Sequence, residues 1–349
     1  MFKTNILKYT LILSINSTFI NADLSQLSNI TSSINNWSKQ NQRIQKYKDF
    51  RTKEINSVQK AKAWLDTLNI DLQAIANKGY GDKKRLSELL GAYWVLHRYS
   101  TNIEQEKIQK HIEPFYQYTQ TKQYLNLLTQ NDKLFKKNSM SYFRIMWLFK
   151  EMNFDISHLL KEFKNIQPRM DAHLAQRGDW QKSMFARYYD IFELTKPSSI
   201  AHTERLTGII GKERPLTKYK RMHSYMLTHQ IFVAFDYGNK TTQTRFNEKE
   251  LKYLRRKLPL IVKHYHAKEN WDLVAELLTC MIYLNQAHNK AFKSAYNALL
   301  DAQNENGTWG DYEKLRPKYG EFTDSKYYLH TTEVALIAIQ EKIKGRWAH

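Results

Sequence analysis

The feature that most constrains this chain is a recurring unit of two helix-like segments joined by a short polar break. From about Ile55, apolar residues recur at steps of three and four, which is the spacing of one face of an α-helix. The unit recurs about six times, with spacings of roughly 40 to 50 residues. The breaks lie at residues 79–82, 131–139, 176–180, 211–220, 269–272 and 303–327. A hairpin cannot bury its apolar face alone, so the pattern predicts an all-α fold of stacked helical hairpins.

Chain length and turn content agree with this expectation. The 349 residues include only 11 glycines and 6 prolines, which disfavours turn-dense all-β folds. Residues 23–50 are polar and carry few large apolar side chains, so we expect a leader and a first peripheral helix there. We assign residues 51–349 to a single helical domain, with a capping box of Asn247 and Glu250 opening its fifth hairpin.

The first 22 residues have the pattern of a signal peptide. Lys3 and Lys8 supply positive charge, residues 9–20 are largely apolar, and Ala22 ends a cleavage-site pattern before Asp23. The alternative is an amphipathic N-terminal helix. We expect export to the periplasm or the medium, and no membrane span in the mature protein, because no other segment is apolar enough.

A net charge of +20 favours partners of opposite sign. Such a surplus attracts an anionic polymer or an anionic surface, although lysines and arginines spread along a chain also describe an ordinary solvated surface. No nucleic-acid reading motif and no phosphate-cradling glycine loop is present. The single cysteine, Cys280, lies in an apolar run, which is typical of a buried thiol.

Three breaks place a tryptophan beside an acidic residue just before an expected inner helix. These tryptophans are Trp180, Trp271 and Trp309. The last break, residues 303–311, reads QNENGTWGD and resembles the glutamine–tryptophan repeat of the terpenoid cyclase and protein prenyltransferase superfamily. Residues 328–333, which read YLHTTE, are similar to the segment that follows that repeat.

The resemblance implies an (α/α)6-type toroid, in which inner helices surround a central funnel. It also implies that a histidine opening an inner helix, here His330, can bind zinc. The chain departs from the superfamily because it lacks the DxDD and DDxxD motifs, and Cys280 follows Leu278 where an Asp-x-Cys pair is needed. The resemblance therefore supports the fold and marks the funnel, and it does not carry the activity.

Candidate catalytic residues come from the expected inner helices. They are His229, Asp236, Glu276 and His330. His229 and Asp236 are seven residues apart, about two helical turns, so their side chains would point the same way. A histidine beside a carboxylate suits acid–base chemistry. The alternative is a core histidine bonded to a backbone carbonyl, with Asp236 beginning a turn at Gly238.

Further residues of the same segments are candidates for ligand binding. They are Tyr189, Tyr237, Asp272, Trp309 and Glu333. A zinc site built from His229, Glu276 and His330 is a second possibility, because zinc accepts mixed nitrogen and oxygen ligands. No pair has a diagnostic spacing such as HExxH, so only the fold could assemble that set.

Two functions follow from these observations. The first is an exported enzyme with an acid–base or metal site in its central funnel, whose substrate the sequence leaves open. The alternative is a non-catalytic protein that binds a polyanionic ligand or a protein partner through its basic loops.

Overall fold

The computed structural model describes residues 24–203, 210 and 213–347, and confirms the all-α prediction. Within these residues every regular element is helical, and the only extended pairing is a single bridge between Gln303 and Trp309. The expected signal peptide, residues 1–22, lies outside the described residues. The chain divides into two units, Met1–Ile55 and Asn56–His349. None of the described helices is long and apolar enough to cross a membrane.

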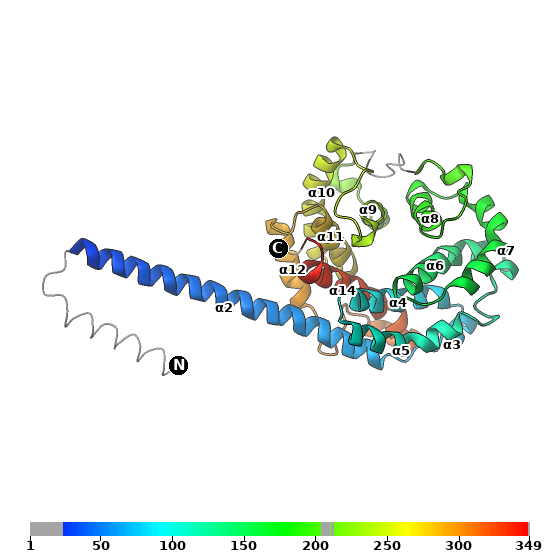
Figure 1. Cartoon of the computed structure of the whole chain (residues 1–349), viewed down its shortest axis with the longest axis horizontal. Helices are drawn as coiled ribbons and strands as arrows, with labels where there is room; N and C mark the ends of the chain where they lie inside the picture. Colours follow the sequence, from blue (N-terminus) through cyan, green and yellow to red (C-terminus); the bar gives the residue numbers. More distant parts are fainter. Residues whose placement is uncertain (1–23, 204–209, 211–212, 348–349) are drawn as a thin grey trace. The chain divides into compact units, whose positions relative to one another are not determined.

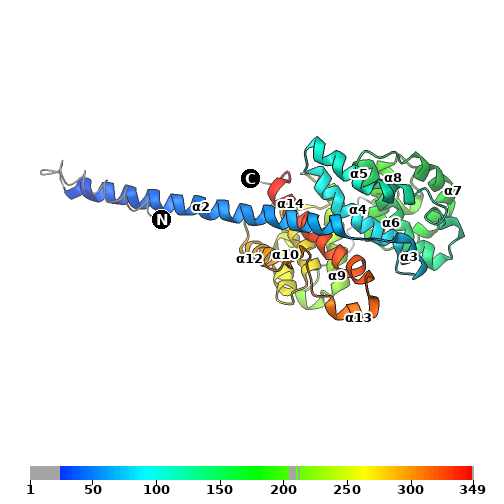
Figure 2. The same cartoon turned by 90° about the horizontal axis from the view of Figure 1, so that it is seen from below.

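Helix α2 (Leu24–Thr67) makes up the described part of the first unit and ends in the second. It is one uninterrupted helix in both views (Figures 1 and 2). The stretch 23–50 is therefore helical from Leu24 onward. The side chains of Trp37 and Tyr47 are 68% and 67% exposed, so α2 carries large aromatic residues in solvent.

Six helices of the second unit pack in a closed circuit. α4 packs against α6, α6 against α8, α8 against α9, α9 against α11, α11 against α14, and α14 against α4 (Figure 1). These helices are α4 (Asp82–Arg98), α6 (Asp132–Glu151), α8 (Asp179–Ile191), α9 (Arg221–Ala234), α11 (Trp271–Tyr283) and α14 (Leu329–Lys344).

Most of the remaining helices pack on this circuit and alternate with it along the chain, except that no α-helix is described between α8 and α9. The outer helices are α3 (Leu72–Asn77), α5 (Asn102–Tyr118), α7 (Ser157–Leu174), α10 (Glu248–His266) and α12 (Lys290–Asp301). α3 and α5 pack on α4, α7 on α6, and both α10 and α12 on α11. Helix α10 buries one stripe, whereas α11 is buried from Asp272 to Tyr283, as expected for an inner helix.

Local signals explain several helix boundaries. Asn247 and Glu250 form the expected capping box, with Asn247 Oδ1 accepting from Glu250 N at 2.9 Å. The break expected at 131–139 is wrong, because α6 already begins at Asp132. The side chain of Asn131 caps its first turn by accepting from Leu134 N at 3.0 Å. The polar residues taken for a break are mostly exposed positions of this first half of α6.

The loop between α12 and α14 is held by a fully buried tryptophan. Trp309 has no exposed surface, and its Nε1–H donates to Leu299 O at 2.7 Å. A short π-helix, Asp324–Tyr328, then leads into α14. Trp309 thus packs the loop against α12 and, contrary to the sequence-based assignment to ligand binding, is not among the residues that line the cavity of about 830 Å³ inside the circuit.

Candidate functional site

A cavity of about 830 Å³ lies inside the circuit of helices. All six inner helices and the loop before α14 contribute to its wall. Helix α11 contributes a carboxyl group, Glu276, from its N-terminal half and an aromatic side chain, Tyr283, from its C-terminal end. The principal polar lining residues are Lys84, Glu88, Arg144, Arg221, Tyr225, His229, Asp272, Glu276, Lys314, Lys326, His330 and Glu333.

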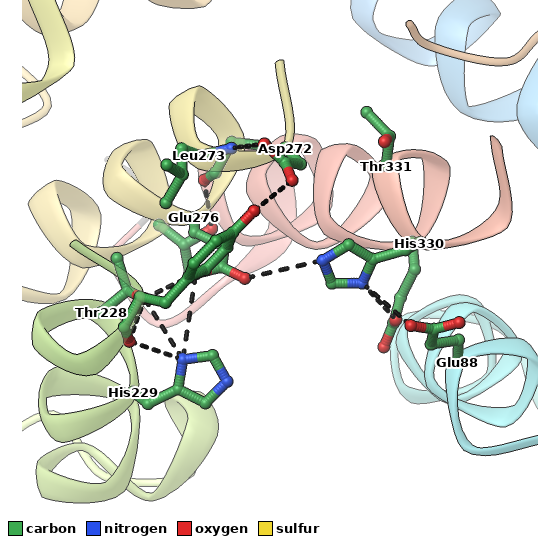
Figure 3. A network of polar contacts seen from close by, with 12 residues as sticks. Glu88, Thr228, His229, Asp272, Leu273, Glu276, His330 and Thr331 are labelled. Carbon is green, nitrogen blue, oxygen red and sulfur yellow. Dashed lines mark hydrogen bonds and ion pairs between the residues drawn. The ribbon is translucent and has the colours of Figure 1, made fainter. Parts of the chain in front are cut away.

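His330 is at the centre of the polar cluster, with a carboxylate on each side (Figure 3). Its Nδ1 lies 3.5 Å from Glu88 Oε1 and 3.7 Å from Glu333 Oε2, and its Nε2 lies 3.9 Å from Glu276 Oε1. Burial acts to lower the pKa of His330, but these three carboxylates outweigh burial and raise it above its ordinary value. The cluster therefore favours the imidazolium form.

Glu333 is held by a buried ion pair with Arg144 of α6. Burial acts to raise the pKa of Glu333, but Arg144 and His330 hold it below its ordinary value. Gly91 of α4 lies against this pair, because a Cβ there would be 2.6 Å from Arg144 Nη2. The missing side chain of Gly91 therefore makes room for the ion pair between three helices.

Glu276 is almost completely shielded from solvent. Its side chain is 2% exposed, and Thr228 Oγ1 donates to its Oε2 at 2.5 Å. Burial raises the pKa of Glu276 to about 7, against the smaller opposing effects of His330 and Thr228. A carboxyl group that exchanges its proton near neutral pH is suited to both general acid and general base catalysis.

His229 faces the same carboxyl group from α9. Its Nδ1 lies 2.8 Å from Tyr225 O and 3.9 Å from Glu276 Oε2. A carbonyl only accepts, so Nδ1 carries the proton and the lone pair is on Nε2. Burial lowers the pKa of His229 to about 4, so the ring is neutral at pH 7. His229 therefore makes the backbone hydrogen bond expected for a core histidine and also lines the cavity.

Asp272 lies one helical turn before Glu276, on the same face of α11. It accepts hydrogen bonds from the Tyr225 hydroxyl, from Arg221 Nη2 at 3.1 Å and, through Oδ1, from Leu273 N at 2.6 Å. Figure 3 shows Asp272 and Glu276 side by side on one helix. Two carboxyl groups in contrasting surroundings therefore line one wall of the cavity.

The structure does not bring Asp236 to His229. Helix α9 ends at Ala234, so the two-turn spacing breaks down before Asp236 is reached. Asp236 instead pairs with Arg187, with Nε and Oδ1 2.5 Å apart. Asp236 and Tyr237 both have positive φ, 49° and 51°, a strained backbone that turns Tyr237 toward the cavity and onto Trp147, 5.3 Å between ring centroids.

Tyr189 also lies away from the cavity. It has no exposed surface, and its hydroxyl donates to Asp171 Oδ1 of α7 at 2.6 Å. Its ring faces the outer helix because the position falls on the other side of α8 from the lining residues Trp180 and Met184. Tyr189 is thus a packing residue.

Two residues of the polar cluster have no counterpart among the sequence-based candidates. Glu88 lies between Leu86 and Leu89 in a leucine-rich stretch, and Arg144 lies within the apolar run 142–149. A charged residue inside an apolar stretch of an inner helix is the signal that marks both, because such a residue needs a partner once it is buried.

The zinc set expected from sequence does not assemble. Across the described parts of the chain, no three or more His, Cys, Asp or Glu side chains form a group that could hold a metal ion. His229, Glu276 and His330 do converge on the cavity wall, at the distances given above.

The chain matches one family over most of its length. That family is described as a domain of unknown function (DUF6895), and the match covers residues 58–339. Comparison with curated proteins gave no match, and comparison with solved structures gave none either. The matched residues span the inner helices that line the cavity.

Proposed function

Because the chain belongs to the family described as a domain of unknown function (DUF6895), we propose its function from its own cavity: an enzyme that uses Glu276 for general acid–base catalysis. The observation that carries the proposal is a buried carboxyl group on a cavity wall that titrates near neutral pH, 3.9 Å from an imidazole. Such a group is both a competent acid and a competent base at pH 7.

The neighbours of Glu276 supply complementary roles. Glu276 gives a proton to the leaving group of a bound substrate, and Asp272, one turn away, receives a proton from the attacking water. Pairs of carboxyl groups in contrasting environments are the common basis for dividing the two roles. Arg144 and Glu333 orient His330, whose charge stabilises the ionised form of Glu276 after proton transfer.

The architecture and destination of the enzyme remain part of this proposal. The circuit of inner helices with outer helices packed on it supports an (α/α)6-type toroid, as the resemblance to the terpenoid cyclase superfamily implies. The missing aspartate motifs argue against terpenoid chemistry. Export is supported by the pattern of residues 1–22 alone.

A non-catalytic role in binding a polyanion is the second candidate. The net charge of +20 favours it, and so do the basic residues Arg221, Lys314 and Lys326 among the lining residues. A binding protein of this kind would not depend on the protonation of Glu276, which separates the two candidates.

Hydrolysis of chromogenic substrates tests the catalytic proposal. Wild-type protein, Glu276→Gln and the exposed-surface control Glu305→Gln are compared on nitrophenyl esters, nitrophenyl glycosides and nitrophenyl phosphate, with circular dichroism to verify folding. We expect turnover of at least one class, about 10²- to 10⁴-fold slower in Glu276→Gln and unchanged in Glu305→Gln. Equal rates for wild type and Glu276→Gln would refute the role of Glu276, and no turnover by the wild type would favour the binding candidate.

A further inference from the structure

Several buried oxygens of the polar cluster lack hydrogen-bond donors. Both carboxylate oxygens of Glu88 and Oε2 of Glu333 are buried without a hydrogen-bond partner, although both residues line the cavity. Buried acceptors of this kind are costly unless something completes them. Glu88 Oε1 and Glu333 Oε2 lie 3.5 Å and 3.7 Å from the same nitrogen of His330, Nδ1, so a single bound molecule in the cavity can reach both side chains.

Charge is not what these carboxylates lack. Glu88 Oε2 is already 2.8 Å from Arg85 Nη1, and Glu333 is paired with Arg144. A cationic ligand would add a charge to a cluster that already has its counter-ions. Neutral O–H donors complete the oxygens without changing the charge balance, because a hydroxyl group offers one donor and carries no charge.

Below the carboxylates the cavity wall becomes aromatic. Trp94 and Trp147 are 5.0 Å apart, Trp147 and Tyr237 are 5.3 Å apart, and Tyr237 and Phe232 are 5.7 Å apart, measured between ring centroids. All four line the cavity and come from different segments. Trp180 of α8 also lines the cavity, with its ring centroid 5.6 Å from that of the His229 ring. The ligand must therefore present an apolar face as well as hydroxyl groups.

We propose that the cavity binds a neutral saccharide, whose hydroxyl groups donate to Glu88 and Glu333 while the C–H face of a sugar ring packs on the half-buried aromatic residues of the wall, such as Trp180 and Tyr237. A pyranose ring combines a rim of hydroxyl donors with apolar faces, which matches both layers of the wall. The volume of about 830 Å³ is within the range of sites that enclose a compact ligand. This inference rests on the proposed function and names its substrate class.

The corresponding reaction is hydrolysis of a glycosidic bond. Glu276 donates its proton to the glycosidic oxygen as the bond from that oxygen to the anomeric carbon breaks. Water forms a new bond to the anomeric carbon and loses a proton to Asp272, which returns it to solvent as Glu276 is reprotonated. Water and one glycosidic linkage become two hydroxyl groups, with no oxidant or other reactant. Two carboxyl groups flanking the scissile bond are the usual equipment for this chemistry.

Binding to a catalytically impaired variant separates this inference from the proposed function. Glu276→Gln is titrated by calorimetry with tetrasaccharides of glucose, xylose, mannose and galacturonate. We expect binding to at least one of the three neutral tetrasaccharides. Adding Glu88→Gln should weaken that binding about 10- to 100-fold, the range for a hydrogen bond to a charged group, whereas adding Glu305→Gln should leave it unchanged.

A second variant, Trp180→Ala, keeps the inference testable if Glu88→Gln does not fold. Trp180 is only partly buried, so Trp180→Ala should remain folded and still weaken binding, because it removes one aromatic wall. Binding without turnover in the wild type would leave the saccharide site standing and overturn the catalytic proposal. Turnover of a non-saccharide, or binding of galacturonate alone in a salt-sensitive manner, would overturn the saccharide inference.

Discussion

The substitution Gly91→Ala tests how the buried ion pair is accommodated between α4, α6 and α14. A Cβ at position 91 would be 2.6 Å from Arg144 Nη2 and 2.8 Å from Glu333 Cδ, both inside van der Waals contact. These atoms are the ends of side chains, but Glu333 is 1% exposed and cannot move into solvent. Separating a buried pair costs about 3 to 5 kcal/mol. Alanine regains about 1 kcal/mol of helix propensity, which leaves a net loss of about 2 to 4 kcal/mol.

Thermal unfolding followed by calorimetry measures this loss directly. A loss of that size corresponds to a fall in melting temperature of about 3 to 6 °C for a unit of this length. In a Glu333→Ala background the two Glu333 contacts are gone, and only the end of the Arg144 side chain, which is 21% exposed and no longer held by Glu333, has to shift. Gly91→Ala should therefore cost much less there, and the two variants should be strongly coupled. Gly178→Ala is the matched control, because its Cβ would meet nothing closer than the Trp180 ring at 3.6 Å. A Gly91→Ala protein that melts at or above the wild-type temperature would refute the reasoning.

Two further predictions concern stability. The pKa of Glu276 is raised from 4.5 to about 7 in the folded state, so between these pH values the folded protein binds more protons than the unfolded chain. The contribution of Glu276 to the free energy of unfolding is therefore complete below about pH 4.5 and is lost as pH rises through 7. Urea titrations measure this effect. From pH 5 to pH 8, the free energy of unfolding of Glu276→Gln should increase relative to that of the wild type by up to about 3 kcal/mol. The same difference between variant and wild type at both pH values would contradict the pKa shift. Gly307→Ala should cost about 2 kcal/mol or more in the same assay, because φ is +93° and a Cβ would meet the backbone at Lys60; unchanged stability would mean that the loop can lift away.

Much of the fold could be predicted because the signals that specify it are local. The three- and four-residue spacing and the capping box of Asn247 and Glu250 depend on neighbours along the chain, and the structure confirms both the helical fold and the cap. The misplaced break at 131–139 shows where local reasoning fails. A polar run reads as a loop, whereas a helix tolerates it on one exposed face once its first turn is capped by Asn131.

The residues of the site could be predicted from the sequence only in part, because their contacts depend on which helices lie close together in space. His229, Glu276 and His330 stood out because each is a chemically active residue within an apolar inner segment, and the structure places all three on one cavity wall. Their protonation states were beyond the sequence, since the pKa of His330 is set by carboxylates from α4, α11 and α14 together. Spacing alone paired Asp236 with His229, but the end of α9 lies between them and Arg187 takes Asp236 as its partner.

Arg144 connects the fold to the proposed chemistry. A guanidinium group on α6 compensates the charge of Glu333, which leaves Glu333 free to hold His330 beside Glu276 rather than to take up a proton itself. Without that cation, the pKa of Glu333 would rise through burial, and His330 would lose one of the three carboxylates that raise its pKa. Helix propensity alone disfavours glycine at position 91, but the ion pair of Arg144 and Glu333 needs the space that Gly91 leaves. Because Glu333 holds His330 beside Glu276, the proposed proton exchange at Glu276 also depends on Gly91.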